Sequence, residues 1–486
     1  MNTMRRTTTG VPGLDEILCG GLVSNRSYLL AGAAGSGKTL LSLQYLLEGV
    51  RLGERCLFLS LAEPCKEITR NAEHLGWDLI GIDMVDLSPN GGEVTKDTEQ
   101  YHVFSPSEVE QDSVLKQIYQ VIDNTRPKRV VIDSLTQLRF LAADEFQFRK
   151  NLLNLVTYLG ATSTALLAFE PTEMDRDAAY GLAVDGIIRL RRDVDETVGI
   201  GLRSVRIEKL RGSDFLDGLH SLRLSATGMR IFPHRIEEAG GELAGEHLVK
   251  TGLTRLDELL GGGIESGTTT LISGPTGAGK SVLGTSLLIS KARQGDHVVL
   301  FTFEEPSSFI LRRCRNIGTP IEDLVASETL TVMRINPMKV LPDEFLSLVR
   351  HEVEERQCTM VMIDSLRGYS LAMAEFGTAV AHIHNLVAYL SRHHVTALLI
   401  SEVENIAGGT LMATDLGVSH YADNVILLRY AEYAGQIIKV INCLKKRLGT
   451  FQPELREYSI TPKGITLGEK LSHLHGVLTG TPADRT

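Results

Sequence analysis

The sequence GPTGAGKS at residues 274–281 decides the fold, because the chain carries a second version of it, GAAGSGKT, at residues 32–39. Both fit the pattern G-x-x-x-x-G-K-[ST]. Each follows a short apolar run, at residues 270–273 and 28–31, and each precedes a leucine-rich stretch with helical spacing. This order of strand, glycine-rich loop and helix is the context that a phosphate-binding loop requires. Two copies in matching contexts predict two sites of one kind.

The loop pattern predicts a particular chemistry. Glycines let backbone N–H groups curl around phosphate oxygens at a helix N-terminus, where partial positive charge collects. The lysine neutralises phosphate charge, and the hydroxyl that follows it ligates Mg²⁺. The residues expected to bind the nucleotide are Gly35, Ser36, Gly37, Lys38, Thr39 and Leu40 in the first copy, and Gly277, Ala278, Gly279, Lys280, Ser281 and Val282 in the second.

The two loops belong to a longer internal duplication. TGVPGLDE at residues 9–16 recurs as TGLTRLDE at 251–258, with the same offset of 242 residues that relates Lys38 to Lys280. The repeat is as long as a domain, and a polar, glycine-rich stretch separates the copies. We therefore expect a first domain at residues 1–236, a linker at 237–247 and a second domain at 248–486.

Short β-branched runs alternate with helical stretches in each copy, which predicts an α/β fold. Apolar runs without polar alternation favour a mostly parallel sheet covered by helices. Ligands of such sheets bind beyond the carboxyl ends of the strands. The strands expected besides those before the loops are 56–61, 130–132, 164–169, 187–190 and 205–207 in the first copy, and 298–303, 360–363, 397–401, 425–428 and 439–441 in the second.

Composition narrows the class of protein. The chain of 486 residues has a formal net charge of −10, which makes nucleic acid an unlikely partner, since Lys and Arg carry that affinity. It has no run of 18 apolar residues that would cross a membrane. Its six cysteines include no C-x-x-C pair, so a reducing cytoplasm is the expected location.

Carboxylates follow strands next to each phosphate loop. Asp133 and Asp364 end apolar runs and are expected to support the Mg²⁺ together with the loop hydroxyls of Thr39 and Ser281; the alternative is a buried structural carboxylate. A glutamate at a neighbouring strand end can orient or deprotonate the attacking group. The glutamates in that position are Glu63 in the first copy, where Ala62 replaces a second glutamate, and Glu304 and Glu305 in the second copy.

Two basic pairs on a late strand complete the candidate set. Lys209 and Arg211 in the first copy correspond to Lys445 and Arg447 in the second, and alternation along a strand would direct both members of a pair to one face. Such pairs can be merely solvated. The sharper hypothesis is that they reach the phosphates of a neighbouring subunit, which requires a closed ring with a nucleotide between subunits.

The ordered set of T-G-x-x-x-L-D, phosphate loop, strand with carboxylate, I-D-S-L strand and late K-x-R occurs in both halves and resembles the KaiC family. The resemblance covers roughly residues 5–468. It implies tandem RecA-like ATPase domains and ATP as the nucleotide. It also implies a homohexamer with ATP at subunit interfaces, in which the N-terminal ring hydrolyses ATP and the C-terminal ring is a serine/threonine kinase that phosphorylates itself. Family members include circadian clock proteins that bind regulatory protein partners.

The resemblance also implies phosphoacceptors in the second domain. The register of DNVILL at residues 423–428 puts Ser419 at the family's acceptor serine and His420 at its acceptor threonine, and Thr414 matches a further threonine nearby. Glu304 is expected to activate Ser419 of the adjacent subunit. Two other hypotheses stay open: a nucleotide-switched ATPase scaffold without kinase activity, and a RecA- or DnaB-like motor on DNA.

Overall fold

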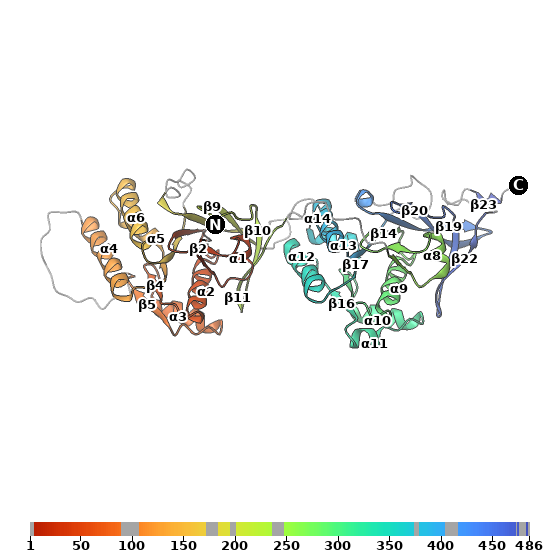
Figure 1. Cartoon of the computed structure of the whole chain (residues 1–486), viewed down its shortest axis with the longest axis horizontal. Coiled ribbons are helices and arrows are strands. Elements are labelled where there is room, and N and C mark those ends of the chain that lie inside the picture. Colours follow the sequence, from red (N-terminus) through yellow and green to blue (C-terminus); the bar gives the residue numbers. More distant parts are fainter. Residues whose placement is uncertain are drawn as a thin grey trace. The chain divides into compact units, whose positions relative to one another are not determined.

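The computed structural model describes residues 4–88, 106–171, 183–194, 201–235, 247–373, 379–403, 417–472, 474–475 and 483–484. The chain splits into two compact units, Met1–Arg235 and Ile236–Thr486 (Figure 1). Each unit has the same plan of one large sheet between two layers of helices. Most of the linker expected at residues 237–247 and the candidate acceptor Thr414 lie outside the described residues.

The described residues of the first unit form a nine-stranded sheet in the order β11-β10-β9-β8-β3-β7-β6-β4-β5. From β8 to β5 neighbouring strands are parallel, and β9, β10 and β11 extend the sheet in antiparallel fashion. A two-stranded ribbon precedes it, formed by β1 (Arg6–Thr7) and β2 (Leu22–Val23). The sheet strands are β3 (Ser27–Ala31), β4 (Cys56–Ser60), β5 (Ile82–Asp86), β6 (Arg129–Asp133), β7 (Thr164–Phe169), β8 (Gly186–Val194), β9 (Gly201–Leu210), β10 (His220–Ser225) and β11 (Gly228–Phe232).

Helices cover the two faces of this sheet and bury its apolar side chains. One core contains leucines of α2 together with apolar residues of β10 and β11, and the other contains apolar residues of α4, α5 and α6. The strands in the middle of the sheet are buried along their whole length, which explains why they appear in the sequence as continuous apolar runs. The helices are α1 (Leu14–Ile17), α2 (Lys38–Arg51) and α3 (Cys65–His74) on one face, and α4 (Pro106–Thr125), α5 (Leu135–Leu141) and α6 (Glu145–Leu159) on the other.

The second unit repeats this topology. Its described strands pair in the order β16-β15-β17-β18-β14-β19-β20-β21-β22, again parallel as far as β19 and antiparallel beyond it. The ribbon β12 (Leu248–Val249) and β13 (Ile264–Glu265) precedes them, and β23 (Leu474–His475) pairs with β24 (Ala483–Asp484). The sheet strands are β14 (Thr269–Gly274), β15 (Val298–Thr302), β16 (Leu330–Arg334), β17 (Met360–Asp364), β18 (Thr396–Glu402), β19 (Asn424–Tyr433), β20 (Gln436–Lys446), β21 (Arg456–Thr461) and β22 (Gly464–Lys470).

The helices of the second unit also form two layers, each with its own apolar core. A π-helical turn at His351–Glu355 continues α12, and a 3₁₀ turn at Val418–His420 precedes β19. One layer contains α8 (Thr254–Leu259), α9 (Lys280–Ala292), α10 (Ser307–Asn316) and α11 (Glu322–Ala326), and the other contains α12 (Pro342–Arg350), α13 (Leu366–Met373) and α14 (Ala379–Arg392).

The fold confirms the expected class of two tandem RecA-like α/β domains with mostly parallel sheets. Every strand expected from an apolar run is present, and several extend further than the run indicated. The sequence did not single out β5, β10 and β11, or β16, β21 and β22, which lie at or next to the edges of the sheets. Apart from β11, these strands are less buried than the central strands. Within the described residues, no helix has the length and apolar character needed to cross a bilayer.

Candidate functional site

Each phosphate loop joins the central strand of its sheet to the helix that follows. Gly37 and Gly279 stand directly before α2 and α9 with φ of 105° and 96°, a left-handed conformation that glycine adopts without strain. A Cβ at Gly37 would lie 2.7 Å from Met229 Cε, and one at Gly279 would collide with Ile460 Cδ1. Both positions therefore favour glycine for the backbone conformation, and a larger residue would also require the Met229 or Ile460 side chain to move.

The loop lysines point back into their own loops. Lys38 Nζ donates to the carbonyls of Gly32 at 2.8 Å and Ala33 at 3.0 Å, and Lys280 Nζ donates to that of Pro275 at 2.9 Å. Burial lowers the pKa of both lysines, although nearby carboxylates oppose the shift. A bound phosphate would offer each ammonium group a stronger, charged acceptor.

A hydroxyl and a carboxylate meet at the start of each loop helix. Thr39 Oγ1 donates to Asp133 Oδ2 at 2.6 Å, and Ser281 hydrogen-bonds Asp364. Burial raises the pKa of Asp133, and it raises that of Asp364 to about 6, so both carboxylates would gain from a cation.

These oxygen donors fit Mg²⁺, which takes one or two carboxylates from the protein and completes its shell with phosphates and water. Groups of three or more His, Cys, Asp and Glu side chains that could cage a metal do not occur among the described residues. The hydroxyl–carboxylate pairs are thus suited to a metal shared with a nucleotide.

The candidate catalytic glutamates differ between the two units. Burial, followed by the charges of Asp133 and Glu67, raises the pKa of Glu63. In the second unit, Glu304 accepts a hydrogen bond from Ser365 Oγ at 2.6 Å. Glu305 instead forms an ion pair with Arg313 of α10.

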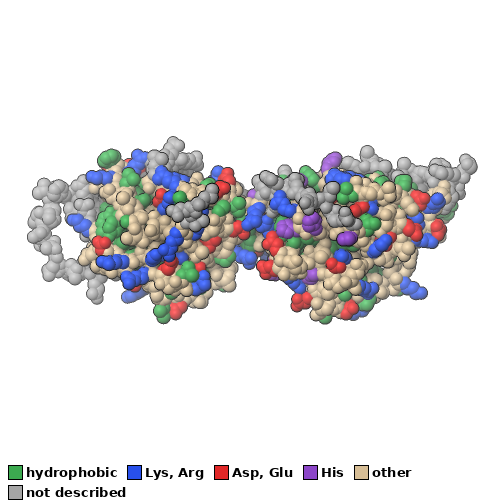
Figure 2. Space-filling model, viewed as in Figure 1, with side chains coloured by type: hydrophobic (Ala, Val, Ile, Leu, Met, Phe, Trp, Pro, Cys, Tyr) green, Lys and Arg blue, Asp and Glu red, His purple; other side chains and the backbone are tan. Residues whose placement is uncertain are grey.

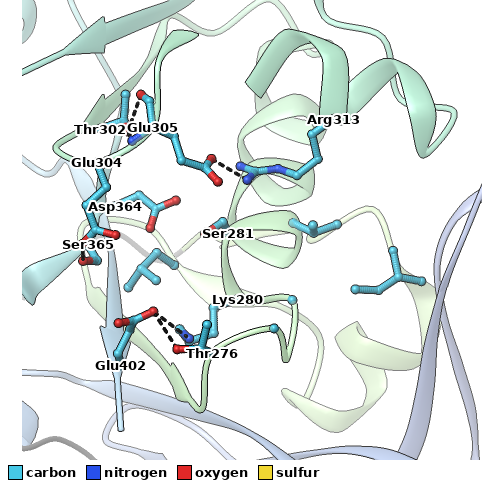
Figure 3. A pocket seen from close by; sticks show the side chains of 15 residues that line it. Thr276, Lys280, Ser281, Thr302, Glu304, Glu305, Arg313, Asp364, Ser365 and Glu402 are labelled. Atoms are coloured by element: carbon cyan, nitrogen blue, oxygen red, sulfur yellow. Dashed lines mark hydrogen bonds and ion pairs between the residues drawn. The ribbon is translucent and has the colours of Figure 1, made fainter. Parts of the chain in front are cut away.

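A pocket lies over each phosphate loop. The pocket of the second unit has a volume of about 370 Å³ and is lined by Lys280, Ser281, Glu304 and Asp364 among others (Figure 3). That of the first unit, about 290 Å³, is lined by its phosphate loop, Glu63 and apolar residues of α2 and α3. In the second unit the structure therefore brings the loop, the Ser281–Asp364 pair and both glutamates into one cavity. The cavity of the first unit contains its loop, Thr39 and Glu63.

Two carboxylates and one cation at these sites were not predicted from the sequence. Glu170, just after β7, accepts a hydrogen bond from Ala34 N in the loop at 3.0 Å. Glu402, at the end of β18, lies 3.8 Å from Lys280 Nζ. Both follow the repeated sequence TALL, so alignment of the two copies could have found them. Arg313 of α10 pairs its Nη1 with Glu305 Oε2 at 2.5 Å.

The basic pairs do not reach the phosphate loop of their own unit. Lys209 Nζ donates to Val184 O at 2.6 Å, ahead of β8. Lys445 Nζ donates to Ser419 O at 3.2 Å and Ala422 O at 2.7 Å, ahead of β19. Arg447 completes this group with its own bonds to His420 O and the Asp423 carboxylate, both at 3.2 Å.

The strand that carries each basic pair ends between the two members of the pair. Strand β9 ends at Leu210 and β20 ends at Lys446, so Arg211 and Arg447 each lie one residue beyond the ladder. A register shift next to Ile187 and another next to Val425 place one extra residue in each strand just before Lys209 and Lys445. In the second unit the two side chains converge because both bind the segment that precedes β19.

The segment that precedes β19 lies at the opposite end of the central strand β14 from the phosphate loop. Asp423 N donates to Thr269 O at 2.8 Å, at the first residue of β14, whereas the loop follows Gly274 at its last. The separation along the strand is roughly 16 Å, from a rise of about 3.3 Å per residue. Asp185 N bonds Ser27 O at the start of β3 in the same way. The basic pairs and Ser419 are therefore remote from their own loops.

Comparison with known proteins identifies the family. The family model of the KaiC ATPase matches residues 7–236 and again residues 249–472. The chain belongs to the KaiC family of ATPases. It is 26% identical to the circadian clock protein KaiC3 of Synechocystis sp., over 99% of this chain and 95% of that protein. It is 27% identical to the circadian clock oscillator protein KaiC of Synechococcus elongatus, over 98% and 91% of the two chains.

Membership of the KaiC family confirms the resemblance seen in the sequence and accounts for the duplicated site. Each match of the family model contains one phosphate loop, one hydroxyl–carboxylate pair and one late basic pair. Nucleotide binding and ATPase activity follow from the family at this level.

Proposed function

We propose that the protein is a Mg-ATP-dependent ring of KaiC-like subunits in signalling or timing, in which the first domain hydrolyses ATP and the second is an autokinase for Ser419. ATP binds between subunits of a homohexamer, with the loop of one subunit facing the basic pair of the next. In the first domain, Lys38 holds phosphate oxygens, and Thr39 and Asp133 would hold Mg²⁺. Lys280, Ser281 and Asp364 act likewise in the second.

The first domain is suited to hydrolysis by water. Glu63 lines the pocket, and burial with neighbouring negative charge raises its pKa, which makes it a better proton acceptor than an exposed glutamate. Glu63 orients the attacking water and takes its proton while the bond to the terminal phosphoryl group breaks. A bound Mg²⁺ would supply charge neutralisation at the phosphates.

The second domain is suited to transfer onto a hydroxyl from another subunit. Glu304 accepts a proton from Ser419 Oγ of the neighbour as that oxygen bonds to the γ-phosphorus, and the bond to the β-phosphate oxygen breaks to release ADP. Lys445 and Arg447 of the neighbour stabilise charge on the phosphates. The Ser365 hydroxyl, 2.6 Å from Glu304 Oε1, orients the base.

The observation that carries the proposal is the place of Ser419. The hydrogen bonds from Lys445 and Arg447 hold the backbone around Ser419 against the basic pair, at the far end of the central strand from the loop. Ser419 therefore cannot reach a phosphate in its own loop without rearrangement of the sheet. A ring brings this edge of one subunit to the loop of the next, and supports transfer between subunits.

A mixed-subunit experiment tests this directly. Chains with Ser419→Ala keep the second phosphate loop but lack the acceptor, and chains with Lys280→Ala keep the acceptor but lack the loop lysine. We expect little phosphoprotein from labelled ATP with either variant alone, and label on the Lys280→Ala chain when the two are mixed before assembly. Equal labelling of Lys280→Ala chains with and without the partner variant would exclude transfer between subunits.

One observation favours a second candidate, an ATPase scaffold without kinase activity. His420 stands where the family resemblance places a second hydroxyl acceptor. ATP turnover with no stable phosphoprotein in any mixture would support this candidate. The DNA motor is less favoured, because charged side chains of both signs are interspersed on the visible face of both units (Figure 2) and the net charge is −10.

A further inference from the structure

Arg313 marks a difference between the two nucleotide pockets. The offset that relates Lys38 to Lys280 pairs Glu63 with Glu305 and Asn71 with Arg313. Asn71 and Arg313 each line the pocket of their own unit, one from α3 and the other from α10. The second pocket therefore has a cation at a position where the first has a neutral amide.

The guanidinium group of Arg313 is only partly used within the protein. Its Nη1 pairs with Glu305 Oε2 at 2.5 Å, whereas its Nε and Nη2 are buried and have no hydrogen-bond partner among the described residues. Figure 3 shows the side chain extending from α10 toward Glu305, on the same side of the pocket as Ser281. Buried donors without acceptors are uncommon in folded proteins, and they point to an acceptor that the protein itself does not supply.

The chemistry of the unpaired donors identifies that acceptor. A guanidinium group presents its N–H groups in a planar fork that matches the oxygens of phosphate. The same pocket contains the loop lysine Lys280 and the Ser281–Asp364 pair, which are suited to phosphates and Mg²⁺. A nucleotide phosphate bound in this pocket would therefore be a fitting acceptor for Nε and Nη2 of Arg313.

We propose that Arg313 binds phosphate oxygens of the nucleotide in the second domain through Nε and Nη2, while Nη1 holds Glu305 beside them. Arg313 is thus a nucleotide-binding residue of the second site and a positioning residue for Glu305. The first site, with Asn71, lacks this contact and binds nucleotide less tightly. This inference rests on the proposed binding of ATP by the second domain.

Calorimetric titration with Mg-ATP, Mg-ADP and adenosine tests the proposal, in a chain whose first loop is silenced by Lys38→Ala. We expect Arg313→Asn to weaken ATP and ADP binding about 10–100-fold, as loss of two charge-assisted hydrogen bonds would, and to leave adenosine binding unchanged. Asn is the natural residue at the matching position of the first domain. Arg313→Lys, which keeps the charge without the fork, should fall between.

Two further variants separate a phosphate contact from a merely structural one. Glu305→Gln removes the ionic partner of Arg313, so ATP affinity should stay the same or rise if Arg313 itself binds phosphate. Arg315→Asn is the matched control, because Arg315 lies on the same helix, is 68% exposed and pairs with Glu322. Its ATP affinity should not change.

The outcomes distinguish failure of this inference from failure of the proposed function. If the Lys38→Ala chain binds no Mg-ATP, nucleotide binding by the second domain is wrong. If it binds Mg-ATP and Arg313→Asn binds it equally well, the role of Arg313 is wrong. Equal losses in Arg313→Asn and Glu305→Gln, with adenosine affected as much as ATP, would reduce Arg313 to a support for Glu305 and likewise overturn the proposal.

Discussion

Replacement of Asp364 by Asn tests whether the second site is built around a cation. Burial raises the pKa of Asp364 from 3.8 to about 6, opposed by the Ser281 hydroxyl and Arg313 and reinforced by Glu305 and Glu304. At about 1.36 kcal/mol per pH unit, the ionised carboxylate costs the folded domain roughly 3 kcal/mol at pH 7. An amide carries no such cost, so Asp364→Asn should raise the free energy of unfolding by about 1–3 kcal/mol without nucleotide.

The gain in the free energy of unfolding from Asp364→Asn should depend on pH. Because the folded-state pKa lies above the unfolded value, the carboxyl group contributes its full stability below about pH 4 and loses it as the pH rises through about 6. The Asn variant does not titrate. Its advantage should be small at pH 4, about half complete at pH 5 and nearly complete at pH 7. Mg-ATP should stabilise the wild type more than the variant, since only the wild type supplies the carboxylate ligand.

Thermal unfolding followed by circular dichroism measures the effect, with tryptophan fluorescence as an internal reference. Trp77 is the only tryptophan of the sequence and packs against the core of the first unit, so its signal should not respond to Asp364→Asn. Each kcal/mol corresponds to about 2–4 °C in the midpoint for a unit of this size. The matched variant Asp133→Asn should shift the Trp77 transition instead, because burial also raises that pKa. A destabilised Asp364→Asn chain at pH 7, or equal gains at pH 5 and pH 7, would refute the reasoning.

Three further predictions address other parts of the two sites. Glu63→Gln should reduce ATP turnover about 10²–10⁴-fold in a chain with Lys280→Ala. Because the pKa of Glu63 is raised, wild-type turnover should fall on acidification at a pH above the usual value of 4.5. An unchanged rate in the variant would show that Glu63 takes no part in catalysis. Gly279→Ala should abolish nucleotide binding to the second domain in titrations, since φ is 96° and the methyl group would meet Ile460. Arg447→Ala should lower phosphoprotein formation about 10³-fold or more, as loss of an arginine finger does. Near wild-type labelling would indicate that Arg447 is a solvated residue and not an arginine finger.

The parts of the fold that the sequence predicted are those with a local pattern. The phosphate loops favour glycine at Gly37 and Gly279, and the central strands are buried on both faces, so each feature leaves a recognisable run of residues. The same holds for Asp133 and Asp364, which directly follow such runs. The edge strands β5, β16 and β22 are less buried, and their mixed composition does not separate them from loops.

The parts that the sequence did not predict depend on contacts between distant residues. Arg313 is one of several arginines on α10, and only its approach to Glu305 and the pocket distinguishes it. The hydrogen bonds from Lys445 to the backbone around Ser419 join segments 26 residues apart and arise from the pairing of β19 with β20. The sequence indicated each residue type but not that these side chains meet.

The most direct test of the central claim is intact mass measurement and peptide mapping of the wild-type chain after incubation with Mg-ATP. The account predicts one added phosphate, located on Ser419, and an unmodified chain when Ser419→Ala is treated in the same way. ATP turnover with an unmodified wild-type chain would contradict the autokinase and favour the ATPase scaffold.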